Sequence, residues 1–121
     1  MSTPADSGKE VMIAVISLKE KMAKIPQPWS PIELLKANDQ VARMALFDGE
    51  YPWHKHVNED ELFYVYKGSI IIQVRGHPNI ALHEGEMAVI PKGVEHSPRR
   101  LDWLAHATVD ATSRLRFARA E

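Results

Sequence analysis

The chain has 121 residues, a formal net charge of −1 and no cysteine. This length can bury one compact core but leaves no room for a second domain. Acidic and basic residues are interspersed, so the sequence lacks the basic surface expected of a nucleic-acid-binding protein. The absence of cysteine excludes a disulfide framework and a thiolate metal site. It fits a reducing compartment, and we expect a cytoplasmic protein.

The N-terminal part combines a polar start with one apolar run. Residues 1–10 are expected to form a flexible tail. Residues 11–16 are β-prone and predict an extra strand, either exchanged with or packed on a second subunit. This run is too short to cross a bilayer and has no signal-peptide features, so we expect no membrane partner. Ser17 and Glu20 form a capping-box pattern, which predicts a short helix over residues 18–24 that ends before Pro26.

From residue 32 the pattern changes to short β-prone segments separated by Gly, Pro, Asn or Asp. The expected strands are 32–37, 40–47, 62–66, 70–75, 80–82, 87–90 and 103–109. Hairpin signals at Asn38-Asp39 and Lys67-Gly68 join the first two pairs. Many short strands at regular spacing predict an all-β jelly-roll barrel with a short N-terminal helix. The predicted units are 1–10, a flexible tail; 11–39, a strand, helix and barrel-edge segment; 40–112, the barrel; and 113–121, a C-terminal tail.

Four residues predict a mononuclear metal site. On an extended strand His54 and His56 point to the same side, so both imidazoles can reach one ion. Glu61 adds a carboxylate from the next strand, and His96 arrives from a distant part of the chain. Three imidazoles and a carboxylate favour one divalent transition metal, namely Mn, Fe, Co, Ni, Cu or Zn, over Mg or Ca. Two neighbouring carboxylates are alternative ligands, Glu59 and Asp60.

The spacing of these residues resembles the two motifs of the cupin superfamily. The first motif is Gly49…His54-x-His56-x4-Glu61-x6-Gly68, and the second is Gly85-x5-Pro91-x-Gly93-x2-His96. The resemblance covers roughly residues 40–110. Gly49 precedes His54 by four intervening residues where five is common, and Arg100 replaces a usual Asn. The x4 spacing and the following Gly68 favour Glu61 over its neighbouring carboxylates, and the resemblance implies a competent metal site.

The resemblance is strongest to small single-domain cupins described as similar to the barrel of phosphomannose isomerase. Stand-alone members of the superfamily include isomerases, dioxygenases, lyases, decarboxylases and proteins without an established activity, so the fold does not fix the function. The chain lacks the further domains of phosphomannose isomerase, and it has no phosphate-cradling glycine loop. Sugar-phosphate isomerisation is therefore not carried over.

Several other residues are candidates for the mouth of the barrel. Tyr51 and Trp53 precede the first ligand and either cover the metal or pack on the barrel rim. Four further polar residues either line the pocket or face solvent; these are Arg43, Gln73, Arg100 and His106. The histidines at two predicted turns, His77 and His83, are expected to be surface residues.

Strand alternation predicts which face of segment 62–66 is buried. If Glu61 points inward, so do Phe63 and Val65, whereas Leu62, Tyr64 and Tyr66 face outward. Large outward residues need a cover, which favours a homodimer over cover by the N-terminal segment of the same chain.

Two functional hypotheses follow from the metal site. The first is a metal-dependent enzyme acting on a small polar metabolite, such as an isomerase, lyase or dioxygenase. The second is a non-catalytic binding or sensing module in which the metal fixes a small-molecule ligand. A non-ligating general base near the open coordination position would discriminate between them, and His106 and Tyr51 are the sequence candidates. A third hypothesis is a subunit-assembly protein that uses the barrel as a scaffold, in which removal of the metal changes only stability.

Overall fold

The computed structural model describes residues 11–100 and the backbone of residues 106–112. The tails expected at 1–10 and 113–121 lie outside the described residues. Within the described part there are one helix and eight strands: α1 (Leu18–Ala23), β1 (Ile32–Ala37), β2 (Gln40–Phe47), β3 (Glu61–Val65), β4 (Ser69–Val74), β5 (His77–His83), β6 (Met87–Ile90), β7 (His96–Arg100) and β8 (His106–Thr112).

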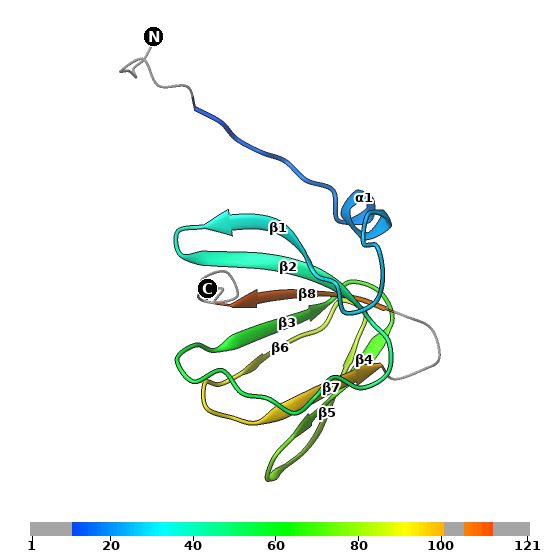
Figure 1. The fold of residues 1–121 in the computed structure, drawn as a ribbon, viewed down its shortest axis with the longest axis vertical. Coiled ribbons are helices and arrows are strands. Elements are labelled where there is room, and N and C mark those ends of the chain that lie inside the picture. Colours follow the sequence, from blue (N-terminus) through cyan, green and yellow to red (C-terminus); the bar gives the residue numbers. More distant parts are fainter. Residues whose placement is uncertain (1–10, 101–105, 113–121) are drawn as a thin grey trace.

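The strands form two antiparallel sheets (Figure 1). The larger sheet has the order β1-β2-β8-β3-β6, and the smaller one has the order β5-β4-β7. Side chains from both sheets share one apolar core: Phe63 and Val65 come from β3, and Ile70 and Ile72 come from β4. Because the two sheets pack over a common core, the fold is the expected all-β jelly roll. The short N-terminal helix is also confirmed.

The alternation predicted for β3 is confirmed. Glu61, Phe63 and Val65 are 5%, 2% and 0% exposed, whereas Leu62 and Tyr64 are half-buried. A carboxylate therefore continues the row of inward apolar side chains. Burying a carboxylate is costly unless it is paired, so its place in this row requires polar partners or a cation beside it.

A second apolar cluster covers part of the outer face of the larger sheet. Ile25, Leu34 and Met44 are buried there, and side chains of α1 and Tyr66 pack against them. The chain itself thus covers Tyr66, as in the same-chain alternative. The Ser17 side chain accepts a hydrogen bond from the backbone N–H of Glu20 at 3.2 Å, which caps the helix as the sequence predicts.

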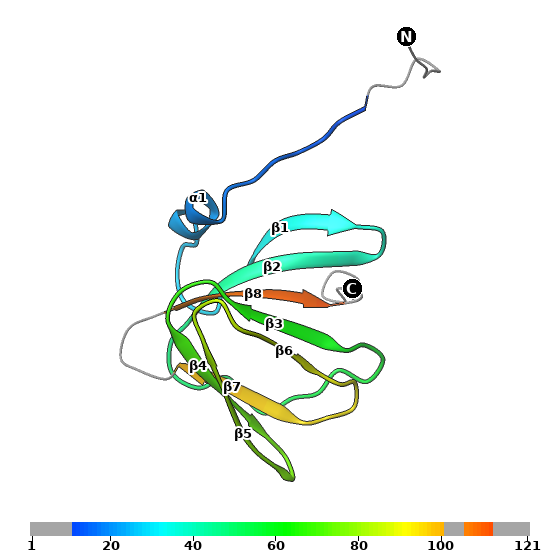
Figure 2. The same ribbon diagram turned by 180° about the vertical axis from the view of Figure 1, so that it is seen from behind.

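Several expectations about strands differ from the structure, and β8 ends at Thr112 instead of residue 109. Residues 11–16 form an unpaired extended segment that runs away from the sheets (Figure 2). β5 begins at His77 instead of residue 80, and β7 was not predicted as a strand. Both strands contain a proline, Pro78 or Pro98, which lowers the apparent strand propensity. Both lie at an edge of the smaller sheet, where a missing N–H is tolerated.

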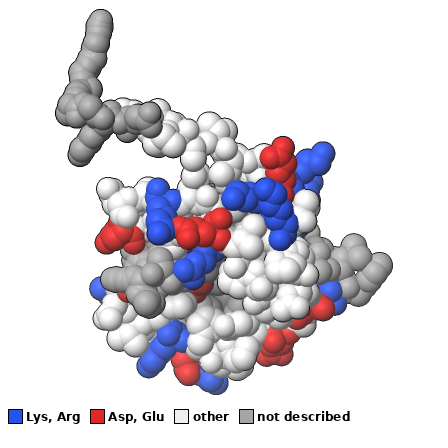
Figure 3. Space-filling view, turned by 45° about the horizontal axis from the view of Figure 1, so that its top comes forward, with Lys and Arg blue, Asp and Glu red and all other residues white. Residues whose placement is uncertain are grey.

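The surface carries both signs of charge. Lys, Arg, Asp and Glu side chains lie side by side on the face shown in Figure 3, with no extended area of a single sign. This distribution agrees with the small net charge of −1. No helix among the described residues is long and apolar enough to cross a membrane.

Candidate metal centre

Two segments far apart in the chain are joined at the metal-ligand positions. The backbone N–H of His54 donates to the carbonyl of His96 at 3.0 Å, and the N–H of His96 donates to the carbonyl of His54 at 2.9 Å. The backbone N–H of Gly93 also donates to the carbonyl of His56 at 2.8 Å. Gly93 has φ 82, a conformation that favours glycine. These bonds hold the two histidine segments side by side, although only His54 in segment 54–56 makes a β-bridge.

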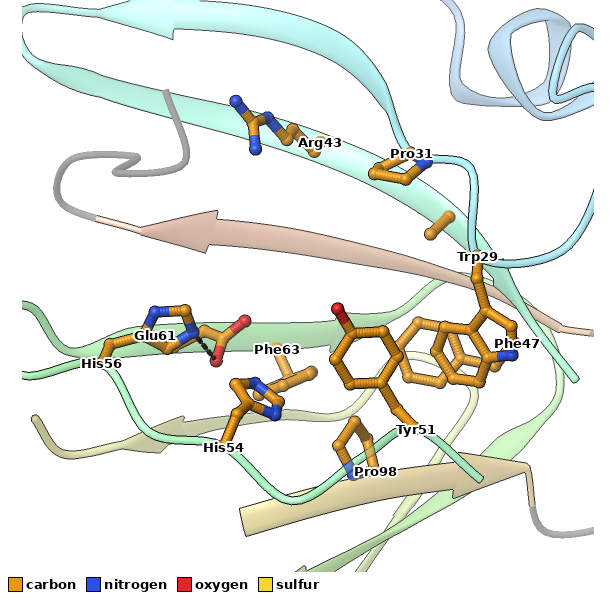
Figure 4. A pocket seen from close by; sticks show the side chains of 11 residues that line it. Trp29, Pro31, Arg43, Phe47, Tyr51, His54, His56, Glu61, Phe63 and Pro98 are labelled. Atoms are coloured by element: carbon orange, nitrogen blue, oxygen red, sulfur yellow. Dashed lines mark ion pairs between the residues drawn. The ribbon is translucent and has the colours of Figure 1, made fainter. Parts of the chain in front are cut away.

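The four predicted ligands converge on one point. One ligand atom from each of His54, His56, Glu61 and His96 lies within 4.8 Å of all the others, a group positioned to bind a metal ion. Glu61 Oε1 lies 3.0 Å from Nε2 of His56 and 3.0 Å from Nε2 of His96. Glu61 and His96 are buried, whereas His54 and His56 are half-buried at the side of the pocket. Figure 4 shows His54, His56 and Glu61 turned toward one another.

Backbone carbonyls orient two of the imidazoles. Nδ1 of His54 lies 2.9 Å from the carbonyl oxygen of Pro52, and Nδ1 of His96 lies 2.9 Å from that of Val94. When Nδ1–H donates to such a carbonyl, the ring proton is on Nδ1. Nε2 then keeps a lone pair that can bind a metal ion. Metal-ligating histidines in proteins are commonly oriented in this way.

The donor set fits a transition-metal ion. Zn–N bonds are about 2.0–2.1 Å long, so ligand atoms on opposite sides of one ion lie about 4 Å apart. The four donor atoms lie within 4.8 Å of one another. Side-chain shifts of tenths of an ångström therefore suffice to bring all four to bonding distance from one ion. Nitrogen-rich donors favour Mn, Fe, Co, Ni, Cu or Zn over Mg or Ca.

Burial lowers the pKa of His54 below its ordinary value of 6.5. Desolvation is the main cause; the neighbouring imidazoles of His96 and His56 add to it, whereas the hydrogen bond to Pro52 and the Glu61 carboxylate oppose it. A neutral imidazole is the form that binds a metal. The environment therefore keeps His54 in its ligating form to a lower pH than that of an exposed histidine.

The neighbouring carboxylates stand outside this group. Asp60 Oδ1 accepts a hydrogen bond from the backbone N–H of Lys92 at 2.9 Å, so this side chain fixes the turn before β7. Neither Asp60 nor Glu59 is part of the cluster that the described residues form around His54, His56 and Glu61. The geometry thus favours Glu61 among the three carboxylates.

His54, His56 and Glu61 lie at one end of a pocket of about 240 Å³. An aromatic wall formed by Trp29, Phe47 and Tyr51 bounds the other end (Figure 4). The ring centroids of Trp29 and Phe47 are 4.5 Å apart, and those of Trp29 and Tyr51 are 5.1 Å apart. The Tyr51 ring also meets the His54 ring edge-on at 5.1 Å. The pocket therefore joins a polar end to an apolar one.

Trp29 lines the pocket, a place that no sequence pattern predicts. Trp29 has φ 60, an uncommon backbone conformation for a residue other than glycine. Its backbone N–H donates to Leu46 at 2.9 Å, and its indole N–H donates to the carbonyl of Asp48 at 2.6 Å. These bonds hold the indole against the pocket. Trp29 lies in a proline-rich segment without periodicity, so only the presence of a large aromatic residue there could have drawn attention to it.

The other candidates separate into pocket and non-pocket residues. Arg43 and Tyr51 line the pocket. Gln73 instead donates a hydrogen bond to Glu50 at 2.8 Å, and Arg100 pairs with Asp48 at 2.9 Å. These two side chains secure the segment that leads to the first histidine.

The remaining aromatic and histidine candidates lie away from the pocket or outside the described side chains. Trp53 packs against Arg75, whose guanidinium carbon is 4.5 Å from the ring centroid, and it does not line the pocket. His77 and His83 are exposed, as expected. The side chain of His106 lies outside the described residues.

Comparisons with known proteins agree with this architecture. A family model described as a cupin domain matches residues 44–102. The uncharacterized protein YdbB of Bacillus subtilis (strain 168) is 33% identical over 76 residues, which cover 63% of this chain and 67% of that protein.

Solved structures show the same relationship. A cupin-2 domain containing protein from Shewanella frigidimarina is 37% identical with a TM-score of 0.75, and the match covers 80% of this chain and 92% of that one. Protein NMB1881 from Neisseria meningitidis is 27% identical with a TM-score of 0.74, over 82% and 98% of the two chains. The jelly-roll fold, the two motifs and these matches agree with one another. The chain belongs to the cupin superfamily.

Proposed function

We propose that this protein is a metal-dependent enzyme that acts on a small chelating metabolite. His54, His56, Glu61 and His96 would hold one divalent transition metal. The observation that carries the proposal is the placement of this donor group at the end of a pocket instead of inside a closed core. A bound ion with an open coordination position would supply Lewis-acid chemistry to a substrate oxygen.

The pocket limits the size and polarity of the substrate. A volume of about 240 Å³ lies just below the roughly 300–1,000 Å³ that is typical of small-molecule pockets. Such a space takes a small metabolite. Trp29, Phe47 and Pro98 provide apolar walls, and Arg43 provides one cationic side chain at the pocket. We infer a substrate with oxygen donors at one end and an apolar group at the other.

Tyr51 is the residue best placed to transfer a proton. It lines the pocket without belonging to the donor group, and its hydroxyl is directed into the pocket in Figure 4. Its ring is braced between Trp29 and His54, with centroid distances of 5.1 Å to each. A positioned acid or base of this kind distinguishes an enzyme from a module that only binds a ligand, and it contributes typically 10²–10⁴-fold to a rate.

The test combines metal loading with product analysis. Untagged protein is loaded separately with Mn, Fe(II), Co, Ni, Cu and Zn, and each form is incubated with small 2-hydroxy acids, 2-oxo acids and 1,3-diketones that carry apolar substituents. Proton nuclear magnetic resonance then detects binding and conversion separately. We expect conversion with at least one metal, and we expect Tyr51→Phe to lower the turnover number on the order of 100-fold or more with the metal content unchanged. Tight binding without conversion for every metal would support the sensing module instead.

A further inference from the structure

Strand β2 places a cation on the wall of the pocket. Its alternate residues Arg43, Ala45 and Phe47 line the pocket. Met44, which lies between them in the sequence, is buried in the outer apolar cluster instead, so strand alternation turns Arg43 to the inner face of the larger sheet. An arginine on an inner face is uncommon, and this one borders a pocket instead of packed side chains. A small molecule in the pocket can therefore reach its guanidinium.

The register of the larger sheet separates Arg43 from the metal ligands. β8 lies between β2 and β3, and both Arg43 and Phe63 pair with Asp110 of β8. Neighbouring strands are about 4.8 Å apart, so the backbones at Arg43 and Phe63 are about 10 Å apart. Glu61 lies two residues from Phe63 along β3, a further step of about 7 Å. Figure 4 shows Arg43 on one side of the pocket and His54 on the other, with room for a small molecule between them.

The charges around the pocket favour an anionic ligand. Among the lining residues that the structure describes, Arg43 has the one permanent positive charge and Glu61 the one carboxylate. A divalent ion would more than offset the charge of Glu61, because imidazoles bind a metal as neutral groups. The occupied metal centre and Arg43 would then both attract an anion.

The chemistry of the guanidinium favours a carboxylate. Its planar fork of N–H donors matches the two oxygens of a carboxylate or a phosphate. A phosphate would bring a second negative charge, and the described lining residues offer no second permanent cation for it. Arg43 also interacts with the protein itself. A guanidinium has five N–H donors, so such an interaction leaves donors for a ligand.

We propose that Arg43 determines specificity by binding the carboxylate of the substrate. The site would then take small carboxylic acids that carry a second oxygen donor, a hydroxyl or carbonyl group, for the metal. The apolar part of the same molecule would lie against the aromatic wall of Trp29, Phe47 and Tyr51. This inference rests on the proposed metal-dependent function and narrows its substrate class.

Calorimetric titration with two matched ligands tests the assignment. The zinc-loaded protein is titrated with 2-hydroxy-3-methylbutanoate and with the corresponding amide, which has nearly the same shape but no charge. A metal ion also attracts the carboxylate, so the preference of the natural protein does not by itself implicate Arg43. Arg43→Gln isolates the contribution of the guanidinium. It should weaken binding of the acid about 10- to 100-fold and change binding of the amide by about twofold or less.

Two further variants separate local charge from net charge. Arg75→Gln is the matched control, because Arg75 pairs with Glu95 at 3.1 Å and stacks on Trp53 instead of lining the pocket. It removes the same charge and should leave both affinities unchanged. Arg43→Lys keeps the charge but loses the fork, so its affinity for the acid should lie between those of the natural protein and Arg43→Gln. Zinc content and circular dichroism are measured for every variant.

Three results would overturn the assignment. The first is an unchanged affinity of Arg43→Gln for the acid, or an equal loss for acid and amide. The second is a loss in Arg43→Lys as complete as in Arg43→Gln, because a role based on charge survives in lysine. The third is a natural zinc-loaded protein that does not bind the acid at millimolar concentration.

These results are distinct from a failure of the proposed enzyme. Binding of the acid through Arg43 without conversion by any metal form would contradict the enzyme and leave the assignment in place. Conversion of a neutral diketone, together with unchanged binding of the acid by Arg43→Gln, would contradict the assignment and leave the enzyme in place.

Discussion

The metal centre and the segment formed by residues 11–16, here called the N-terminal arm, depart from ordinary burial in opposite directions. The metal centre buries a carboxylate and an imidazole, with Glu61 and His96 only 5% and 1% exposed, whereas the arm leaves Ile13 82% exposed. Buried polar groups need partners, and exposed apolar groups need a cover. The metal centre meets this need in part within the chain, because Glu61 Oε1 lies 3.0 Å from Nε2 of both His56 and His96, whereas Ile13 stays exposed. We propose a metal ion as the remaining partner of the metal centre.

Acid should affect the metal centre more strongly than any other part of the molecule. Each imidazole must be neutral to bind a metal, so affinity falls by up to about tenfold per pH unit for every histidine that has to lose a proton. The pKa of His54 is lowered by burial, so its proton competes only below the ordinary value of 6.5. Chelator competition between pH 8 and pH 4 measures this effect, and a constant affinity over that range would contradict the proposed ligands.

The same pKa shift makes a prediction for the protein without metal. The folded pKa of His54 lies below the unfolded value, so the unfolded chain binds more protons as the pH falls below 6.5. The contribution of His54 to the free energy of unfolding is therefore highest above pH 6.5 and decreases toward acid. Urea denaturation of the metal-free protein and of His54→Gln at several pH values measures this contribution as the pH-dependent part of the difference between the two proteins. A difference that stays constant between pH 8 and pH 4 would contradict the lowered pKa.

Truncation of an apolar side chain should lower the free energy of unfolding much more in the inner core than in the arm. Phe63→Ala removes a ring that is 2% exposed, and it should lower the free energy of unfolding by about 3–5 kcal/mol. Ile13→Ala is the matched change in the arm and should shift the unfolding of the monomer by only about 0.5 kcal/mol or less. Both values come from urea denaturation at low protein concentration. Equal losses would show that the arm packs on its own chain.

The helix cap beside the arm should give the smallest measurable effect. Ser17→Ala removes the acceptor for the N–H of Glu20, and the expected loss is about 1 kcal/mol. Ser17→Asp keeps an acceptor and should restore most of the stability. Thermal denaturation of the three proteins gives the comparison, and an unchanged midpoint for Ser17→Ala would show that the cap does not fix the exit of the arm.

Much of the architecture could be predicted from local patterns. The spacing in the sequence predicts His54, His56, Glu61 and His96 as ligands, and their donor atoms lie within 4.8 Å of one another in the structure. Alternation predicted the buried face of β3, and the capping pattern predicted α1. These features succeed because each depends on a short stretch of chain or on a pattern of glycines and prolines that specifies turns.

The remaining features depend on contacts that the sequence does not display. β7 contains Pro98 and two arginines, so its strand character arises from pairing with β4 and not from propensity. The place of Trp29 in the pocket depends on hydrogen bonds to Leu46 and Asp48. Segment 11–16 has the composition of a strand but lacks a partner within the described chain. In each case tertiary contacts, or their absence, override the local pattern.

The most direct test of the proposed metal centre is metal analysis of untagged protein beside its His56→Ala variant. Elemental mass spectrometry after reconstitution should give about one equivalent of a transition metal per natural chain, because the four donor atoms are within 4.8 Å of one another and suit one ion. His56→Ala should lose stoichiometric metal while circular dichroism shows a folded barrel. A full equivalent of metal in His56→Ala, or no metal in the natural chain, would contradict the account.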